Sequence, residues 1–439
     1  MKHTNLREFM RYAAGNVMGM IGLSCYILAD TFFISKGLGA AGLTALNLAI
    51  PVYSFVHGCG LMLGMGGATK YSIFRGLENE QGADGAFNCA VRLAAVQSVV
   101  FMLIGLIFSE NLTAILGADE EVFVMTETYL KVILLFAPAF IFNDIFLCFV
   151  RNDGNPGLAM TAMLAGSFSN IVMDYIFIFP LGMGILGAVL ATGTAPLIGM
   201  GILAGHLLKK KNHFHLRKEK RSLRLTSTVI SLGMPSLIGE VASGIVMIVF
   251  NVIILGLQGN IGVAAYGIIA NLSLVVTSVC TGVAQGMQPL TSKAYGSGET
   301  QSMKQVLLYA LWTVLGISAV IYFLLFVFAE PIVSAFNSEK NLILQENALI
   351  GMKIYFLSIP FMGCNVVLSM FFSSIEKAIP AQTISLLRGI LLLLPLAFLL
   401  SAIAGMTGVW MTVLVTEAVV MVLGICFYWK YLGSSAVSK

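Results

Sequence analysis

Apolar stretches long enough to cross a lipid bilayer recur along the whole chain, separated by polar turns. A helix needs about 17–25 predominantly apolar residues to span the hydrocarbon core. Twelve stretches meet this requirement, at residues 12–35, 42–66, 87–109, 126–149, 157–179, 184–207, 229–256, 262–290, 305–330, 347–375, 380–403 and 408–431. The pattern therefore predicts an all-α membrane protein with twelve transmembrane helices.

The composition supports this prediction, because only 10% of the 439 residues are charged and 58% are hydrophobic. Water-soluble domains carry about 25% charged residues. We expect a multi-pass protein of the cytoplasmic (plasma) membrane, with the lipid bilayer as its surroundings and a monomer as its working unit. The seven cysteines contain no CxxC pair, which is typical of packing residues rather than of metal ligands or disulfides.

The basic residues indicate how the chain is oriented. If the N-terminus is cytoplasmic, 21 of the 25 basic residues fall on the cytoplasmic side of the predicted spans, and the exceptions are Lys36, Lys131, Lys340 and Lys353. An excess of Lys and Arg in cytoplasmic segments sets the orientation of membrane proteins. Both termini are therefore predicted to be cytoplasmic. The same placement accounts for the net charge of +4 without a nucleic-acid partner.

The two halves of the chain repeat each other. The segment GLMLGMGGATKYSIFRG (60–76) aligns with GVAQGMQPLTSKAYGSG (282–298), 222 residues later, and Pro138 aligns with Pro360 at the same offset. Residues 154–156 align with residues 378–380. An offset that contains six spans gives parallel repeats. We therefore expect two pseudo-symmetric six-helix bundles, divided into an N-terminal lobe (1–208), a cytoplasmic linker (209–226), a C-terminal lobe (227–432) and a tail (433–439).

Ionisable residues inside the predicted spans are the leading functional candidates, because each costs at least about 2.5–3.5 kcal/mol at the bilayer centre. Asp30 and Asp174 lie at a similar depth, about 26 Å from the cytoplasmic starts of their helices. Asn170 precedes Asp174 by four residues and so shares its helical face. Tyr129 and Thr192 can add oxygen atoms near that level. These five residues form the predicted cation-coupling site.

Such a group of oxygens suits two tasks. It could share and release a proton, because one of two neighbouring buried carboxylates holds its proton more tightly than an isolated carboxylate does. The second half has no equivalent, since Leu394 and Phe398 stand where the repeat places Asn170 and Asp174. The alternative is a hydrogen-bonded cluster that only holds helices together. Instead of holding a proton, the same group of oxygens could bind a sodium ion. The candidate sodium ligands are Asp30, Asn170, Asp174 and Thr192.

Four further polar residues lie within predicted spans. Glu240 is expected either to face the space between the lobes, as a substrate contact or second proton site, or to make a structural hydrogen bond. Asp144 is expected to pair with Arg151 or to reach the cytoplasmic interface. Glu417 stays ambiguous between the same functional and structural interpretations. His57 is expected to be a hydrogen-bonded core residue.

No sequence motif points to covalent chemistry. The Walker A, GxSxG and HExxH patterns are absent from the sequence, so we expect neither an enzyme nor a cofactor, with a sodium ion or a proton as the coupling ion. The segment KKKNHFHLRKEKRSLR (209–224) is predicted to be a linker that fixes the topology. Its His213 and His215 are predicted to be solvated loop residues.

Several motifs together resemble those of the MATE (multidrug and toxic compound extrusion) family over about residues 8–432. They are ILADTFFISKGLG around Asp30, GGATKYSIFRG and MQPLTSKAYGSG after spans two and eight, RNDGNP after span four, SNIVMDY in span five, and SLLRGILLLLP around Arg388. The chain resembles the prokaryotic branch related to DinF and MepA most.

This resemblance implies a V-shaped pair of six-helix bundles, the MATE/MOP fold, that exports organic cations in exchange for inward sodium ions or protons. It also implies two candidate coupling sites. Members with an acidic N-terminal lobe use residues that match Asp30, Tyr129, Asn170, Asp174 and Thr192. Other members rely on an acid in span seven, which matches Glu240. The chain has both, so the resemblance leaves the coupling lobe open.

We therefore predict a secondary active multidrug efflux transporter that exchanges small amphipathic organic cations for protons or sodium ions by alternating access. The main alternative is a flippase for a lipid-linked oligosaccharide or peptidoglycan precursor, from the same superfamily. Flippases usually need cationic residues to meet a pyrophosphate, whereas Arg388 is the only deeply placed arginine here. A passive channel or membrane scaffold is a third class.

Overall fold

The computed structural model describes residues 6–217, 222–337 and 341–433, and within these ranges the chain is helical with short connections and has no strand. The first half contains α1 (Leu6–Gly76), α2 (Glu80–Ile107), α3 (Ser109–Ile115), α4 (Phe123–Leu135), α5 (Ala137–Asn152), α6 (Pro156–Ile178) and α7 (Gly184–Leu208). The second half contains α8 (Leu223–Gly296), α9 (Thr300–Val327), α10 (Ala329–Phe336), α11 (Leu342–Tyr355), η1 (Phe356–Ser358), α12 (Ile359–Ser374), α13 (Ala378–Leu386), η2 (Leu387–Leu391), α14 (Leu393–Tyr428) and η3 (Trp429–Gly433).

Three long helical segments each contain two spans joined at one glycine. The 71 residues of α1 would extend about 105 Å if unbroken, several times the thickness of the hydrocarbon core. The chain turns at Gly39 in α1, Gly259 in α8 and Gly405 in α14, with φ values of 67°, 62° and 55°. Glycine adopts this left-handed conformation without steric strain. Eight helical segments and one bent pair are long and apolar enough to cross a membrane, and these three turns divide them into the twelve predicted spans.

The predicted spans 126–149 and 347–375 are broken rather than continuous, and the π-helical turn η2 interrupts the predicted span 380–403. The α4–α5 pair bends by 46° at Phe136. In the second half, the three-residue 3-10 turn η1 separates α11 from α12. Pro138 and Pro360 lie at the first turns of α5 and α12. Proline disfavours helix in the residue before it and suits a helix start, so the aligned prolines explain both breaks.

The loops after spans four and ten refine the predicted repeat. Gly154 and Glu376 both have positive φ, at 90° and 59°. The next residue in each loop donates a backbone hydrogen bond to the carbonyl five positions earlier, from Asn155 to Val150 and from Lys377 to Phe372. Gly154 therefore corresponds to Glu376, at an offset of 222, and its predicted alignment with residue 378 was wrong by two positions.

Each half has its own apolar core. One buried cluster consists of side chains between Ile34 and Phe214, and the other of side chains between Phe250 and Leu432. The second cluster also includes Phe9 and Tyr12 from the beginning of α1. Helix α8 begins at Leu223, inside the predicted linker. The lobe boundaries at 208 and 227 stay a prediction.

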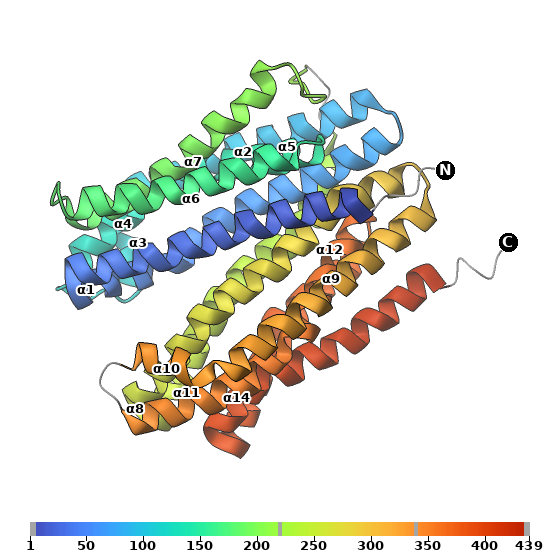
Figure 1. The fold of residues 1–439 in the computed structure, drawn as a ribbon. Helices are drawn as coiled ribbons and strands as arrows, with labels where there is room; N and C mark the ends of the chain where they lie inside the picture. Colours follow the sequence, from blue (N-terminus) through green and yellow to red (C-terminus); the bar gives the residue numbers. More distant parts are fainter. Residues whose placement is uncertain (1–5, 218–221, 338–340, 434–439) are drawn as a thin grey trace.

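The two halves meet at one end of the molecule and diverge toward the other (Figure 1). The beginning of α1 and the end of α14 lie at the closed end. Glycines allow the backbones to approach there: a side chain on Gly66 would overlap the Val229 carbonyl, and one on Gly76 would overlap that of Lys293. Close backbone packing through small residues is typical of transmembrane helix pairs.

Candidate functional site

The structure brings Asp30 and Asp174 together inside the first lobe. Asp30, on the first part of α1, is 6% exposed, and Asp174, on α6, is fully buried. The two carboxyl groups lie within hydrogen-bonding reach of each other. In each of them, Oδ1 is buried without a hydrogen-bond partner among the described residues. Both carboxyl groups therefore have oxygen available for a small cation or a proton.

Asn170, Thr192 and Tyr129 complete the predicted group. With its amide oriented to satisfy both ends, Asn170 donates to Oδ2 of Asp174 at 3.1 Å and accepts from the backbone nitrogen of Thr192 at 3.2 Å. The Tyr129 hydroxyl, on α4, interacts with the side chain of Thr192, on α7. All three residues are buried. Four helices thus place five predicted residues around one point.

The chemistry of this cluster is that of an oxygen site. No lysine, arginine or histidine forms an ion pair with Asp30 or Asp174 in the described ranges. The same ranges contain no group of three or more His, Cys, Asp or Glu side chains able to hold a metal ion. Carboxylate, amide and hydroxyl oxygens are ligands of hard cations. The residues present therefore fit a sodium ion carried as a substrate, or a proton.

In the second lobe the buried acid, Glu417, is paired with a basic side chain. Glu417 is 3% exposed. Its carboxylate accepts hydrogen bonds from Nη2 of Arg388 at 2.8 Å and from Nδ2 of Asn365 at 2.7 Å. Residues 392–398 (LLLPLAF), which include every position that the repeat matches to Asn170 and Asp174, are apolar. Within the described part of the chain, Glu417 therefore has a basic partner, whereas Asp30 and Asp174 have none.

Asp144 pairs with His57, and the expected Asp144–Arg151 pair was wrong. Nδ1 of His57 lies 3.0 Å from Oδ2 of Asp144. Arg151 instead donates to the side-chain oxygens of Asn16, at 2.6 Å, and Gln285, at 2.8 Å. His57 is thus an interior residue with a polar partner, as predicted, and that partner is the carboxylate of Asp144.

Glu240 lies apart from the acid pair, on the first part of α8 in the second half. It is half-buried and faces α1: a Cβ atom on Gly58 would lie 3.1 Å from the Cβ of Glu240. Its carboxylate interacts electrostatically with His57 and Asp144. The two acidic groups that sequence reasoning left as alternatives therefore occupy different places, with Glu240 at the junction between the halves.

Comparison with known proteins decides the family. The family model MatE matches residues 17–176 and 235–399, about three quarters of the chain. The chain belongs to the MatE family. A curated relative, the multidrug export protein MepA of Staphylococcus aureus (strain MRSA252), is 24% identical over 414 residues, which cover 94% of this chain and 91% of the relative.

Solved structures show that the MatE fold extends over the whole chain. A multidrug resistance MATE family transporter of the MOP superfamily, solved in an outward-facing conformation, matches with a TM-score of 0.92 and 22% identity over 99% of both chains. A MOP superfamily transporter from Pyrococcus furiosus, described as having a binding pocket of reverse polarity, matches with a TM-score of 0.90 and 23% identity over both full chains. The predicted fold class, two bundles of six spans, is confirmed.

Sequence reasoning missed a pair of tyrosines beside the MatE acid pair. The hydroxyls of Tyr26 and Tyr53 lie 2.8 Å apart. Tyr26 interacts electrostatically with Asp30 and Asp174. The ring of Tyr53 stacks on His57 with a centroid distance of 5.9 Å. The sequence did show that both hydroxyls lie inside predicted spans. Tyrosine is too common in membrane-spanning helices for that observation to single out these two residues.

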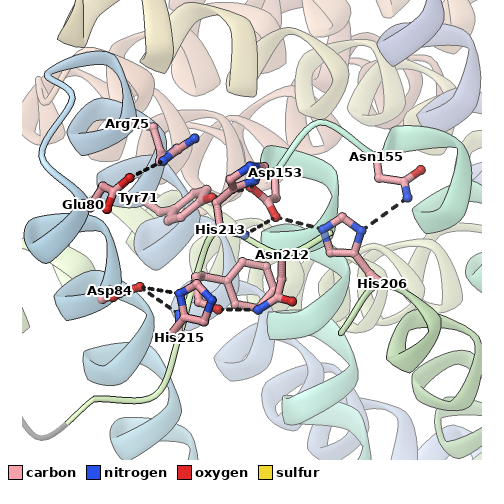
Figure 2. Close-up of polar contacts among 11 residues, drawn as sticks. Tyr71, Arg75, Glu80, Asp84, Asp153, Asn155, His206, Asn212, His213 and His215 are labelled. Carbon is pink, nitrogen blue, oxygen red and sulfur yellow. Dashed lines mark hydrogen bonds and ion pairs between the residues drawn. The ribbon is translucent and has the colours of Figure 1, made fainter. Parts of the chain in front are cut away.

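The linker contacts the first lobe (Figure 2), and its His213 and His215 are exposed loop residues, as predicted. The Asp153 carboxylate accepts from the backbone nitrogen and Nδ1 of His213, both at 2.9 Å, and pairs with Nε2 of His206 at 2.8 Å. The backbone nitrogen of His215 donates to Asp84 at 2.8 Å. Although the imidazoles of His213 and His215 are more than half exposed, each lies beside a buried carboxylate.

Between the two histidines, Phe214 is inserted into the lobe and is only 1% exposed. Its ring lies 4.6 Å from the ring of Phe87, 5.7 Å from that of Phe149 and 6.0 Å from that of Tyr71. These rings come from the cytoplasmic ends predicted for α2, α5 and α1. We call residues 213–217 the docked linker segment.

Polar side chains link the two halves at the closed end. Asn152 donates to Gln288 at 3.0 Å, and Gln288 donates to Thr69 at 3.0 Å. Lys70 forms an ion pair with Glu376 at 2.5 Å. The motifs RNDGNP and GGATKY, which carried the family resemblance, therefore make contacts across the interface between the lobes.

Proposed function

We propose that this chain is a secondary active multidrug efflux transporter that exports small amphipathic organic cations in exchange for protons or sodium ions. Membership of the MatE family and similarity to the multidrug export protein MepA support export of small organic molecules. The acid pair Asp30–Asp174, buried without a basic partner in the described chain, supports ion coupling in the first lobe. That pair is the observation on which the proposal depends.

The proposed coupling step is a change of charge in the first lobe. Two ionised carboxylates in an apolar setting repel each other, and a bound proton or sodium ion removes that repulsion. Asp30 is on α1 and Asp174 on α6, so ion binding favours an arrangement in which these helices are drawn together. An ion can shift a conformational equilibrium only by its difference in affinity for the two states. Reciprocal linkage then lets the ion weaken the binding of substrate.

The orientation follows from the positive-inside rule. With both termini in the cytoplasm, the closed end of the molecule faces the cytoplasm and the lobes diverge toward the exterior. The structure then corresponds to an outward-facing state, in which the coupling ion enters and the substrate leaves. The contacts of Arg151, Asn152 and Lys70 with the second half must separate when the cytoplasmic side opens.

The proposed substrate charge follows from the interior acids. Glu240, half-buried at the junction of the lobes, offers a carboxylate to a positively charged group. The guanidinium of Arg388 is bound by Glu417 and is therefore neutralised. This balance favours cations over the pyrophosphate that a lipid-precursor flippase must bind. A single chain contains both lobes, so a monomer suffices.

The proposal can be tested with purified protein in liposomes by imposing a pH gradient and a sodium gradient separately. We expect ethidium to move against its own gradient under one of them and to stop when that gradient is collapsed. Movement that ignores both gradients would identify a passive pathway. Transfer of a fluorescent lipid-linked oligosaccharide between leaflets, without ethidium transport, would establish the flippase instead.

A further inference from the structure

A buried imidazole–carboxylate pair lies beside Glu240 and has no part in the proposed coupling step. His57 belongs to the second part of α1 and Asp144 to α5, and their side chains are only 14% and 8% exposed. Nδ1 of His57 lies 3.0 Å from Oδ2 of Asp144. Ionisable side chains within a membrane protein are costly to insert, and they usually line a pathway or a binding site.

The second lobe supplies a third ionisable group to this place. Glu240, on α8, lies close to the helix of His57, since a Cβ atom on Gly58 would be only 3.1 Å from the Cβ of Glu240. The carboxylate of Glu240 interacts with the charge of His57 across the junction between the lobes. Neither the ion pairs nor the side-chain hydrogen bonds of the described residues include that carboxylate, so it is available to a ligand.

Among the described residues, the charged groups that act on His57 are both acidic, Asp144 and Glu240. Asp144 faces it from α5 and Glu240 from α8, and the ring of Tyr53 covers it with an interplanar angle of 4°. The Tyr53 hydroxyl contacts Tyr26, which lies toward the acid pair. With both carboxylates ionised, the three groups carry a charge of −2 when His57 is neutral and −1 when it is protonated. The imidazole therefore sets how much negative charge a ligand meets.

We propose that Glu240, Asp144 and His57 form a cation-binding site between the lobes, in which protonated His57 takes the place of the positive charge of the substrate. The inference rests on the proposed export function. It specifies why a bound substrate and a bound proton exclude each other. Neutral His57 leaves two carboxylates for an organic cation. Protonated His57 neutralises one of them, and the organic cation is released.

This arrangement gives exchange with a balanced charge. One proton arrives at Nε2 or Nδ1 of His57 from the outer solution as one monovalent organic cation leaves the site. On the cytoplasmic side, the proton departs to water as the next cation binds. The acid pair and this site need not bind the same ion, because Tyr26 and Tyr53 lie between them.

The test is the affinity of purified protein for ethidium, a fluorescent monocation, at pH 7.5 and pH 5.5. We expect His57→Gln to bind ethidium more tightly than the wild type at pH 5.5, by about tenfold, because one nearby positive charge is removed. Asp144→Asn should weaken binding by a similar factor at pH 7.5. A disrupted structure would weaken binding in both variants, so opposite signs distinguish the two explanations.

Two further measurements make the outcome decisive. His57→Lys keeps a positive charge at both pH values, and we expect weak ethidium binding at both. An uncharged amphipathic dye should bind all variants equally, and the exposed-carboxylate variant Glu110→Gln should match the wild type. Weakened binding in both His57→Gln and Asp144→Asn would overturn the inference even if the wild type transports ethidium. Absence of ethidium binding by the wild type would overturn it together with the proposed function.

Discussion

At the scale of single residues, the two lobes differ in how their buried acids are neutralised. Among the described residues, Asp30 and Asp174 have no basic partner, and Asp174 accepts from the neutral amide of Asn170. Glu417, in contrast, accepts from the guanidinium of Arg388 as well as from the amide of Asn365. A charge without a partner favours binding of a mobile cation, and a paired charge does not need one. This contrast supports the proposed ion coupling in the first lobe and predicts a structural role for Arg388 and Glu417.

The structural role predicts a particular pattern of stability. Glu417→Gln leaves the partly buried charge of Arg388 without its counter-ion, and we expect the free energy of unfolding to fall by about 3 kcal/mol. The double variant Arg388→Met with Glu417→Leu should recover most of that loss, because neither charge remains. Thermal unfolding in detergent, followed through tryptophan fluorescence, measures all three proteins. A single variant as stable as the wild type would contradict this role.

Sequence could identify the acids but not all of their partners. Asp144 and Arg151 are seven residues apart, about 10 Å along one helix, which is too far for direct contact. The actual partner of Asp144, His57, comes from another helix, and its position depends on how α1 and α5 pack. The Asn170–Asp174 contact was predictable because it lies within one turn of one helix.

At the scale of elements, the span pattern predicted the helices well and their interruptions poorly. Length and apolarity placed twelve spans, since the bilayer imposes both. The breaks before Pro138 and Pro360 could have been predicted only by interpreting the two aligned prolines as the starts of new helices. The docked linker segment was beyond prediction, because Asp84 and Asp153 contact it from 60 or more residues away.

The docked linker segment leads to a prediction about hydrogen exchange. The backbone amides of His213 and His215 donate to buried carboxylates, and Phe214 fixes both of them in place. Phe214→Ala should lower stability by about 3–5 kcal/mol and accelerate exchange of those amides. Leu216→Ala is the matched control, since that side chain is 69% exposed. Equal exchange in the two variants would show that Phe214 does not anchor the segment.

At the scale of the whole molecule, a duplicated scaffold carries two different interiors. The repeat predicted the pseudo-symmetric bundles, and the nearly identical backbone angles at Gly39 and Gly259 match that symmetry. The side chains inside do not repeat, because residues 392–398 are apolar where the first lobe has Asn170 and Asp174. We therefore expect the two bundles to move as similar bodies, and the proposal places the response to an ion in the first of them.

The most direct test compares gradient-driven transport with exchange in liposomes that contain Asp30→Asn or Asp174→Asn. Exchange of labelled for unlabelled ethidium at equal concentrations needs substrate binding and rocking, but no ion gradient. We predict that gradient-driven uptake falls by about tenfold or more in both variants, while this exchange continues near the wild-type rate. Undiminished gradient-driven uptake in either variant would contradict the assignment of ion coupling to the acid pair.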